Sequence, residues 1–167
     1  MKLEWLGDYR SMVGTIYRAG NAYSMICKRE ILGDTVAFSP YEVQIMEYIM
    51  EYEDNRKNMS WYAHKMGLAT STYSKYVKKM VEKGLLEKYR ASDNKKNVIL
   101  RVSELGRTEY ETYSRHAKGT WFEGLFERLD ALTSQELKSF QELIELWGSW
   151  HMAMIDPEDP VELERIE

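Results

Sequence analysis

The segment NMSWYAHKMGLATSTYSKYVKKMVEKGLLEKYRASDNKKNVILRV, residues 58–102, contains two helical patterns followed by two extended ones. Asn58 is a favourable N-cap for the first helix, and Gly67 supplies the positive φ of the tight turn that follows it. The second helix ends at Gly84. Residues 85–90 and 98–102 are strand-forming runs on either side of a segment rich in turn formers, so they predict an antiparallel hairpin with a basic tip.

The second of these helices, which starts at Thr70 or Ser71, has two different faces. At 100° per residue its apolar face consists of Tyr73, Tyr76, Val77 and Met80. The opposite face, called the outer face below, centres on Ser71, Lys75, Lys78 and Glu82, with Lys79 beside them. We therefore expect one face to pack and the other to remain accessible to a partner.

Positive charge is concentrated in the same part of the chain. Residues 56–101 contain twelve Lys or Arg and three acidic residues, a net charge of +9, whereas the other residues contain 11 basic and 24 acidic groups, a net of −13. The total charge of −4 hides this asymmetry. Because a polyanion responds to the local field, within about 10 Å at 0.1 M salt, the pattern favours nucleic acid as the partner of this segment.

Two helices are predicted before this segment. Residues 5–32 place apolar side chains at three- and four-residue steps, from Leu6 to Cys27, which is typical of a helix with one apolar stripe. A second helix starts at Pro40, because Ser39 and Glu42 form a capping box around it. It ends near the polar turn at residues 53–58.

Two further helices are predicted after the hairpin. Ser103 caps a helix that runs to about Asp130, and it contains three glycines at which it can bend: Gly106, Gly119 and Gly124. Thr133 and Glu136 form a second capping box, which opens a last helix that extends through Trp150. The acidic segment after Met154 contains two prolines and is predicted to be a flexible tail.

The first helix and the last two helices present more aromatic side chains than a small winged domain can cover. These residues include Tyr9, Tyr17, Tyr23, Trp121, Trp147 and Trp150. An unpaired apolar stripe of this extent usually marks an oligomer interface. The domain organisation expected from this is two groups of dimerisation helices, 1–36 and 104–153, a DNA-binding domain, 37–103, and an acidic tail, 154–167.

The composition limits the class of protein. The chain has 167 residues, of which 44% are hydrophobic and 30% charged, which is consistent with a globular core. No apolar run approaches the ~18 residues of a membrane span, and no signal-peptide pattern is present at the start, so a cytoplasmic location is expected. The sequence has no P-loop, dinucleotide fingerprint, Gly-x-Ser-x-Gly or His-Glu-x-x-His motif, and we therefore do not expect an enzyme.

The helix pair and hairpin together predict contacts with double-stranded DNA. The second helix of a helix-turn-helix places its N-terminal half in the major groove, where short hydroxyl and lysine side chains approach base edges. Ser71, Thr72, Ser74 and Lys75 occupy that half, and Lys78 and Lys79 follow where phosphates come within reach. In the hairpin, Arg90, Lys95 and Lys96 are the candidates for contacts with the backbone or minor groove.

The chain resembles the MarR family of winged helix-turn-helix transcription regulators. The resemblance rests on the order of elements and on short motifs: Ala63 before Gly67-Leu68, Ser71-Thr72, Lys83-Gly84-Leu85-Leu86, Asp93-Asn94-Lys95, and Leu132-Thr133 with Glu136-Leu137. It implies a mainly α fold with a small β-wing and a homodimer joined by the terminal helices. The implied function is that of a ligand-responsive regulator, most often a repressor, which binds pseudo-palindromic operator DNA.

The resemblance also implies a cleft between the dimerisation helices and the winged domain that binds a small, often aromatic, effector. Tyr17, Tyr41 and Trp121 are the candidate effector-binding residues, and no cofactor is expected. The sequence departs from the family at the wing, where Lys95 replaces a common arginine and lacks its planar, bidentate fork. The outer face also has no Arg, Gln or Asn, so the operator sequence is not predicted.

Three alternatives use the same fold in other ways. A winged-helix protein can serve protein–protein contacts alone, in which case any DNA association depends weakly on salt. A redox sensor would use Cys27, but this residue lies near the end of the first predicted helix, and a small buried residue is the simpler interpretation. A metal sensor would use His64, His116 or His151, which have no paired spacing.

Overall fold

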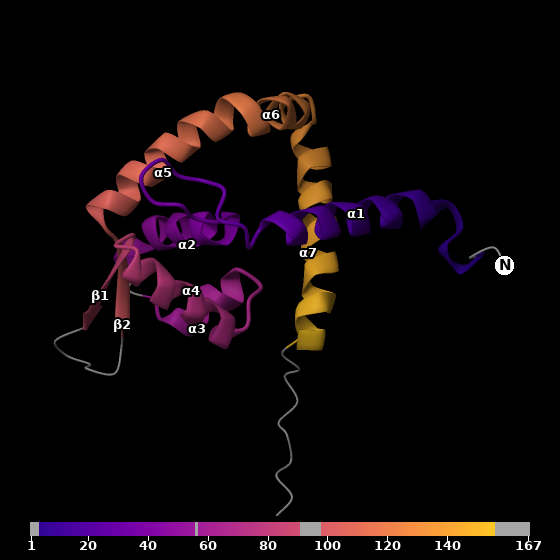
Figure 1. Cartoon of the computed structure of the whole chain (residues 1–167). Helices are drawn as coiled ribbons and strands as arrows, with labels where there is room; N and C mark the ends of the chain where they lie inside the picture. Colours follow the sequence, from indigo (N-terminus) through magenta and orange to yellow (C-terminus); the bar gives the residue numbers. More distant parts are fainter. Residues whose placement is uncertain (1–3, 56, 91–97, 156–167) are drawn as a thin grey trace, which may run out of the picture.

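The computed structural model describes residues 4–55, 57–90 and 98–155. The α-helices and strands follow in the order α1 (Arg10–Ile26), α2 (Pro40–Glu51), α3 (Met59–Lys65), α4 (Thr70–Glu82), β1 (Leu86–Arg90), β2 (Val98–Val102), α5 (Glu104–Ala117), α6 (Glu123–Asp130) and α7 (Ser134–Ile155) (Figure 1). Short 3-10 segments cover Glu4–Tyr9 and Glu53–Asn55, and a π-helical turn covers Lys118–Phe122. The predicted fold class, mainly α with one small β-hairpin, is confirmed.

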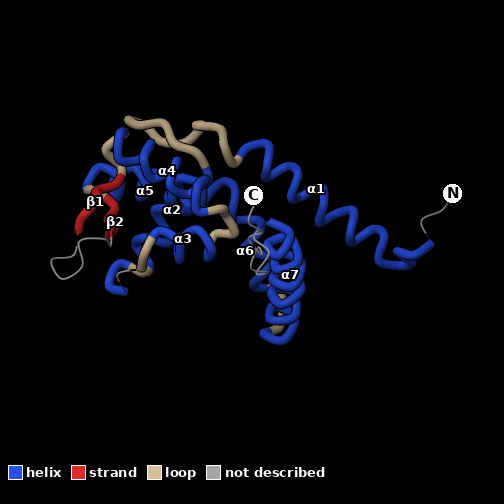
Figure 2. Tube along the Cα trace, turned by 90° about the horizontal axis from the view of Figure 1, so that it is seen from below, coloured by secondary structure: helices blue, strands red, loops and turns tan. Residues whose placement is uncertain are grey.

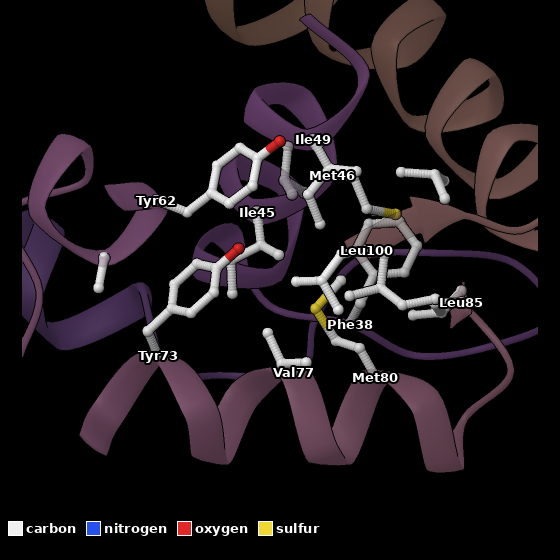
Figure 3. Close-up of a cluster of buried hydrophobic side chains, with 14 of the residues drawn as sticks. Phe38, Ile45, Met46, Ile49, Tyr62, Tyr73, Val77, Met80, Leu85 and Leu100 are labelled. Atoms are coloured by element: carbon white, nitrogen blue, oxygen red, sulfur yellow. The ribbon is translucent and has the colours of Figure 1, made fainter. Parts of the chain in front are cut away.

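One hydrophobic core holds α2, α3, α4 and the base of the hairpin together (Figure 3). Ile45, Met46 and Ile49 of α2 face Tyr73, Val77 and Met80 of α4, and all six are fully buried. Leu85, Leu86, Leu100 and Val102 bring the hairpin into the same cluster. The predicted apolar face of the second helix is therefore the face that packs.

The start of α2 agrees with the capping box expected at Pro40. The Ser39 backbone N–H donates to Glu42 Oε2 at 2.7 Å, and the Glu42 N–H donates to Ser39 Oγ at 3.4 Å. Both residues are buried, so the cap lies inside the core rather than at the surface. This cap fixes the direction in which the chain enters α2.

The first helix is shorter than the predicted range 5–32. Gly7 has a φ of +47°, which interrupts the 3-10 segment, and regular α-helix runs only from Arg10 to Ile26. Cys27 is buried just beyond the helix end, and Leu32 pairs with Phe38 as an isolated antiparallel bridge. The range was too long because the periodicity of apolar residues continues through this bridge, where extended backbone bonds replace helical ones.

The predicted helix 104–130 is divided into α5, the π-helical turn and α6 (Figure 1). The division occurs around Gly119, one of the three glycines at which a bend was expected. The last helix extends to Ile155, one residue beyond the predicted start of the tail. Most of the predicted flexible tail, residues 156–167, lies outside the described residues.

The terminal helices extend away from the core (Figures 1 and 2). They touch through Tyr17 of α1 and Trp147 of α7, whose ring centroids are 5.3 Å apart with the rings nearly perpendicular. No residue of α1 or α6 is buried, and none is buried among residues 134–150. Among the described residues, no helix is both long and apolar enough to cross a membrane.

Candidate nucleic-acid interface

The tight turn between α3 and α4 builds a helix-turn-helix. The Asn58 side chain caps α3 by accepting from the Trp61 N–H at 2.8 Å, as predicted. Gly67 has a φ of +66° and donates to the His64 carbonyl at 3.0 Å, while the Leu68 N–H donates to the Ala63 carbonyl at 2.9 Å. A glycine is favoured here because other L-residues rarely adopt this backbone conformation. The turn places α4 against α3.

The outer face of α4 is open to solvent. Ser71, Lys75, Lys78 and Glu82 are exposed, and the Lys78 side chain keeps 77% of its accessible surface. Lys78 and Glu82 approach only to 3.9 Å, an exposed pair of little energetic weight. Thr72 and Ser74 are half-buried. Lys75 and Lys78 are thus two exposed cations, separated by nearly one helical turn.

Lys79 lies in a different environment from these two lysines. It forms an ion pair with Glu30, a residue of the loop between α1 and α2. Burial lowers the pKa of the Lys79 ammonium, and the like charge of nearby Lys83 lowers it further. Lys79, for which a phosphate contact is predicted, is therefore already paired within the chain.

The wing consists of β1 and β2, which pair antiparallel from Leu86 opposite Val102 to Arg90 opposite Val98. Arg90 is exposed at the end of β1 that leads to the tip. The predicted contacts of Lys95 and Lys96 fall on residues 91–97, outside the described residues, as does the Asp93-Asn94-Lys95 motif.

Glu53 ties the base of the wing to the body of the domain. Its Oε1 accepts from Arg101 Nη1 of β2 at 3.0 Å, and its Oε2 accepts from Arg107 Nη2 of α5 at 2.6 Å. One carboxylate therefore joins the 3-10 segment after α2, the wing and α5. This contact was not predicted, because it depends on residues 48 and 54 positions apart.

The three candidate effector-binding residues lie in three different aromatic contacts. Tyr17 packs on Trp147, and Tyr41 packs edge-on against Tyr76 at 5.4 Å. Trp121 packs against Tyr113 and His116, at 6.1 and 5.6 Å. The structure therefore does not bring Tyr17, Tyr41 and Trp121 into one cluster.

Trp121 lines a cavity of about 250 Å³ between the α1–α2 loop and α5. The loop contributes Ile31, Leu32, Gly33 and Asp34, and the other side consists of Thr112, Tyr113, His116 and Trp121. Glu109 of α5 holds this loop, because its two carboxylate oxygens accept from the backbone N–H groups of Asp34 and Thr35 at 2.9 Å each. The cavity wall is thus a loop fixed to α5 by one buried carboxylate.

The side chains considered for redox or metal sensing have other surroundings. Cys27 is fully buried, and its thiol donates to the Ser24 carbonyl at 3.3 Å. Within the described part of the chain, no group of three or more His, Cys, Asp or Glu side chains is arranged to hold a metal ion. His116 instead lies beside Trp121 at the cavity.

The comparisons with known proteins agree with this geometry. Residues 30–112, which span α2 to most of α5, match the family model described as transcriptional regulator SarA/Rot. The chain belongs to the MarR-like SarA/Rot family of transcriptional regulators. The predicted resemblance to MarR regulators is confirmed, and the regulator is a DNA-binding protein of a non-enzymatic family, as predicted.

Solved structures share the fold of the regulator at low sequence identity. The PcaV transcriptional regulator from Streptomyces coelicolor, in complex with its natural ligand, has a TM-score of 0.61 and 15% identity over 89% of this chain and 97% of its own. FabT from Streptococcus pneumoniae, in complex with DNA, has a TM-score of 0.60 and 16% identity over 86% and 98%. A MepR–DNA complex from S. aureus has a TM-score of 0.56 and 10% identity over 89% and 96%. No curated protein sequence matches the chain.

Proposed function

We propose that the regulator is a cytoplasmic homodimer that represses transcription by binding a pseudo-palindromic operator. The observation that carries this proposal is the exposed pair Lys75 and Lys78 on the outer face of α4, within a segment of net charge +9. Ser71, Thr72 and Ser74 lie in the N-terminal half of the same helix, the half that contacts base edges in a helix-turn-helix. Lys79 lies nearer the C-terminal end of α4, and Arg90 lies on the wing. The wing lysines Lys95 and Lys96 complete the proposed contact with the backbone. FabT and MepR, which share this fold, have been crystallised with DNA.

The proposed dimer uses residues 1–36 and 104–153, and the DNA-binding domain is 37–103. Exposed apolar side chains on these terminal helices support the proposal, among them Met12, Tyr17, Leu143 and Trp150. Large apolar side chains that the chain itself leaves uncovered stabilise a dimer when a second copy covers them. A symmetric dimer would also present two α4 helices to the two halves of a pseudo-palindromic site.

We further propose that a small aromatic effector binds at the cavity beside Trp121. The cavity of about 250 Å³ is slightly below the usual range of ligand pockets, and Tyr113 and Trp121 supply aromatic walls. PcaV, which shares the fold, was solved with its natural ligand. Tyr17 and Tyr41 would influence such a site indirectly, through their contacts with Trp147 and Tyr76.

Substitution of both Lys75 and Lys78 by alanine tests the role of α4. We expect duplex binding to weaken by about 1–3 kcal/mol if one of the two contacts a base, and the salt dependence of binding to become less steep. Fluorescence anisotropy with operator selected from random duplexes measures both. The control is Lys118→Ala with Lys138→Ala, which removes the same charge from two exposed positions outside the helix-turn-helix. A folded Lys75/Lys78 variant that binds the duplex as tightly as this control would refute the proposed role of α4. Weak salt dependence of duplex binding by the parent protein would instead favour a winged-helix protein that serves protein–protein contacts.

A further inference from the structure

Glu30 is an acidic side chain in contact with the basic end of α4. Its Oε1 forms an ion pair with Lys79 and lies 3.3 Å from Lys83 Nζ. Glu30 belongs to the loop between α1 and α2, and its side chain is 32% exposed. The structure therefore places a carboxylate from outside the helix-turn-helix against Lys79, one of the lysines proposed to meet DNA.

Lys83 does not depend on Glu30 for its partners. Its Nζ donates to the Ala37 carbonyl at 2.7 Å and to Glu42 Oε1 at 2.8 Å. Glu42 is fully buried and also closes the capping box of α2. A buried carboxylate is strongly destabilised without a cation, so Lys83 remains paired with Glu42 whether or not DNA is bound. Lys79 is the lysine that Glu30 can hold or release.

Lys79 is close enough to the outer face of α4 to contact a bound duplex. It follows Lys78 directly and lies one turn after Lys75 on the same helix. Its side chain keeps 47% of its accessible surface, less than the 77% of Lys78. A phosphate that approaches the outer face therefore finds Lys79 accessible but already paired.

We propose that Glu30 is an internal competitor for DNA phosphate, which pairs with Lys79 in the unbound protein and gives it up when the duplex binds. This proposal rests on the proposed binding of DNA by α4. An ammonium pairs with a carboxylate and with a phosphate through the same charge-assisted hydrogen bonds, and the two anions repel one another, so they compete for Lys79. Glu30 thus lowers the affinity of the regulator for all duplexes, whatever their sequence.

The exchange predicts a specific dependence on salt. A lysine that neutralises a phosphate releases about one condensed cation, but the displaced Glu30 carboxylate attracts a cation in return. The parent protein therefore gains little net ion release from Lys79. In a Glu30→Gln variant this cation uptake is absent, so the slope of log K against log salt is expected to steepen by up to about 1.

The experiment measures duplex affinity and salt slope for four full-length variants. Glu30→Gln is expected to bind about two- to fivefold more tightly than the parent protein, the range set by an exposed ion pair. The control Glu111→Gln removes one negative charge from an exposed position on α5 and should change affinity little. Lys79→Gln and the double variant Glu30→Gln/Lys79→Gln should bind the duplex with the same affinity. Without the Lys79 ammonium, Glu30 has no cation for which it can compete with phosphate. Thermal unfolding of each variant checks that it is folded.

Two results overturn the proposal. One is a Glu30→Gln variant that binds like Glu111→Gln. The other is an equal gain from Glu30→Gln with and without Lys79, which would mean that Glu30 acts only by repelling the duplex at a distance. Either failure is distinct from a failure of the proposed function, which appears as unchanged binding after loss of Lys75 and Lys78.

Discussion

Glu109 shows how one buried carboxylate can hold a loop. Burial raises the pKa of this side chain, but the N–H groups of Asp34 and Thr35, with further hydrogen bonds from Thr35 and Val36, lower it by more. The net pKa lies below the ordinary value of 4.5. A carboxylate with a depressed pKa stabilises the fold when ionised, fully above its unfolded pKa, and this contribution is lost as pH falls through the folded pKa.

Glu109→Gln should therefore destabilise the protein at neutral pH and have a smaller effect in acid. We expect a loss of about 1–3 kcal/mol at pH 7, because two hydrogen bonds to a charged acceptor are weakened. The difference from the parent protein should shrink as pH falls below 4.5, the ordinary value of the group. Urea unfolding at several pH values measures this, with Glu111→Gln, an exposed residue of the same helix, as the control. A difference that stays constant down to pH 3 would contradict the role assigned to the Glu109 charge.

Gly106 is required by a close approach between α5 and the residue before β1. A Cβ added at this position would lie 2.3 Å from the Leu85 carbonyl oxygen and 2.8 Å from Val102 Cγ1. Backbone cannot yield as a flexible side chain does, so Gly106→Ala should cost about 1–3 kcal/mol in stability. Gly124→Ala is the control, because its Cβ would meet nothing within 4 Å and alanine favours helix. Thermal unfolding that finds Gly106→Ala as stable as Gly124→Ala would show that α5 can shift.

At the scale of elements, the loop between α1 and α2 connects three parts of the molecule. Glu30 contacts Lys79 of α4, and the next residues, Ile31 to Asp34, line the cavity. Glu109 attaches the same loop to α5. The proposed effector site and the proposed DNA-binding helix are therefore joined by one short segment.

The wing is expected to add affinity without sequence preference. Glu53 holds the base of the wing through Arg101 of β2 and attaches it to Arg107 of α5. Substituting both Lys95 and Lys96 by alanine should weaken binding to all duplexes alike and lower the salt slope by roughly 1 for each phosphate that is no longer neutralised. Binding to selected and scrambled duplexes over a range of salt concentrations measures both effects. An unchanged slope would remove the wing lysines from the interface.

At the scale of the whole molecule, apolar surface is distributed unevenly. Helices α2, α3 and α4 and the base of the wing share a closed core, whereas α1, α6 and α7 leave large apolar side chains exposed, among them Met12 (58%) and Trp150 (56%). Exposed apolar surface of this extent, on helices that extend away from the core, is unusual for a monomer. It is the physical basis for the proposed dimer.

Light scattering should give a molar mass near twice the chain mass of 19.8 kDa at micromolar concentration. Leu143→Glu, which places a charge on the 55%-exposed apolar side of α7, should shift the mass towards that of one chain. Gln141→Glu adds the same charge two residues away, on the opposite side of the helix, and should leave the dimer intact. A parent protein that remains a monomer would reject the proposed interface.

The accuracy of prediction from sequence depended on whether the determining interactions were local. The capping boxes at Ser39 and Thr133, the Gly67 turn and the two faces of α4 follow from neighbouring residues, because caps, turns and helical periodicity act over a few positions. The hairpin was recognisable for the same reason. The end of α1 was placed too late, because apolar spacing cannot distinguish helix from the Leu32–Phe38 bridge.

Contacts between segments that are distant in the sequence could not be predicted from local patterns. Glu30 with Lys79, Glu53 with Arg101 and Glu109 with Asp34 join residues about 50 to 75 positions apart, and exposed and buried carboxylates look alike in sequence. The separation of Tyr17, Tyr41 and Trp121 into different contacts has the same cause. Local chemistry thus specified the helix-turn-helix and its positive charge, whereas the packing of elements determined which of its lysines are exposed and which already have a partner.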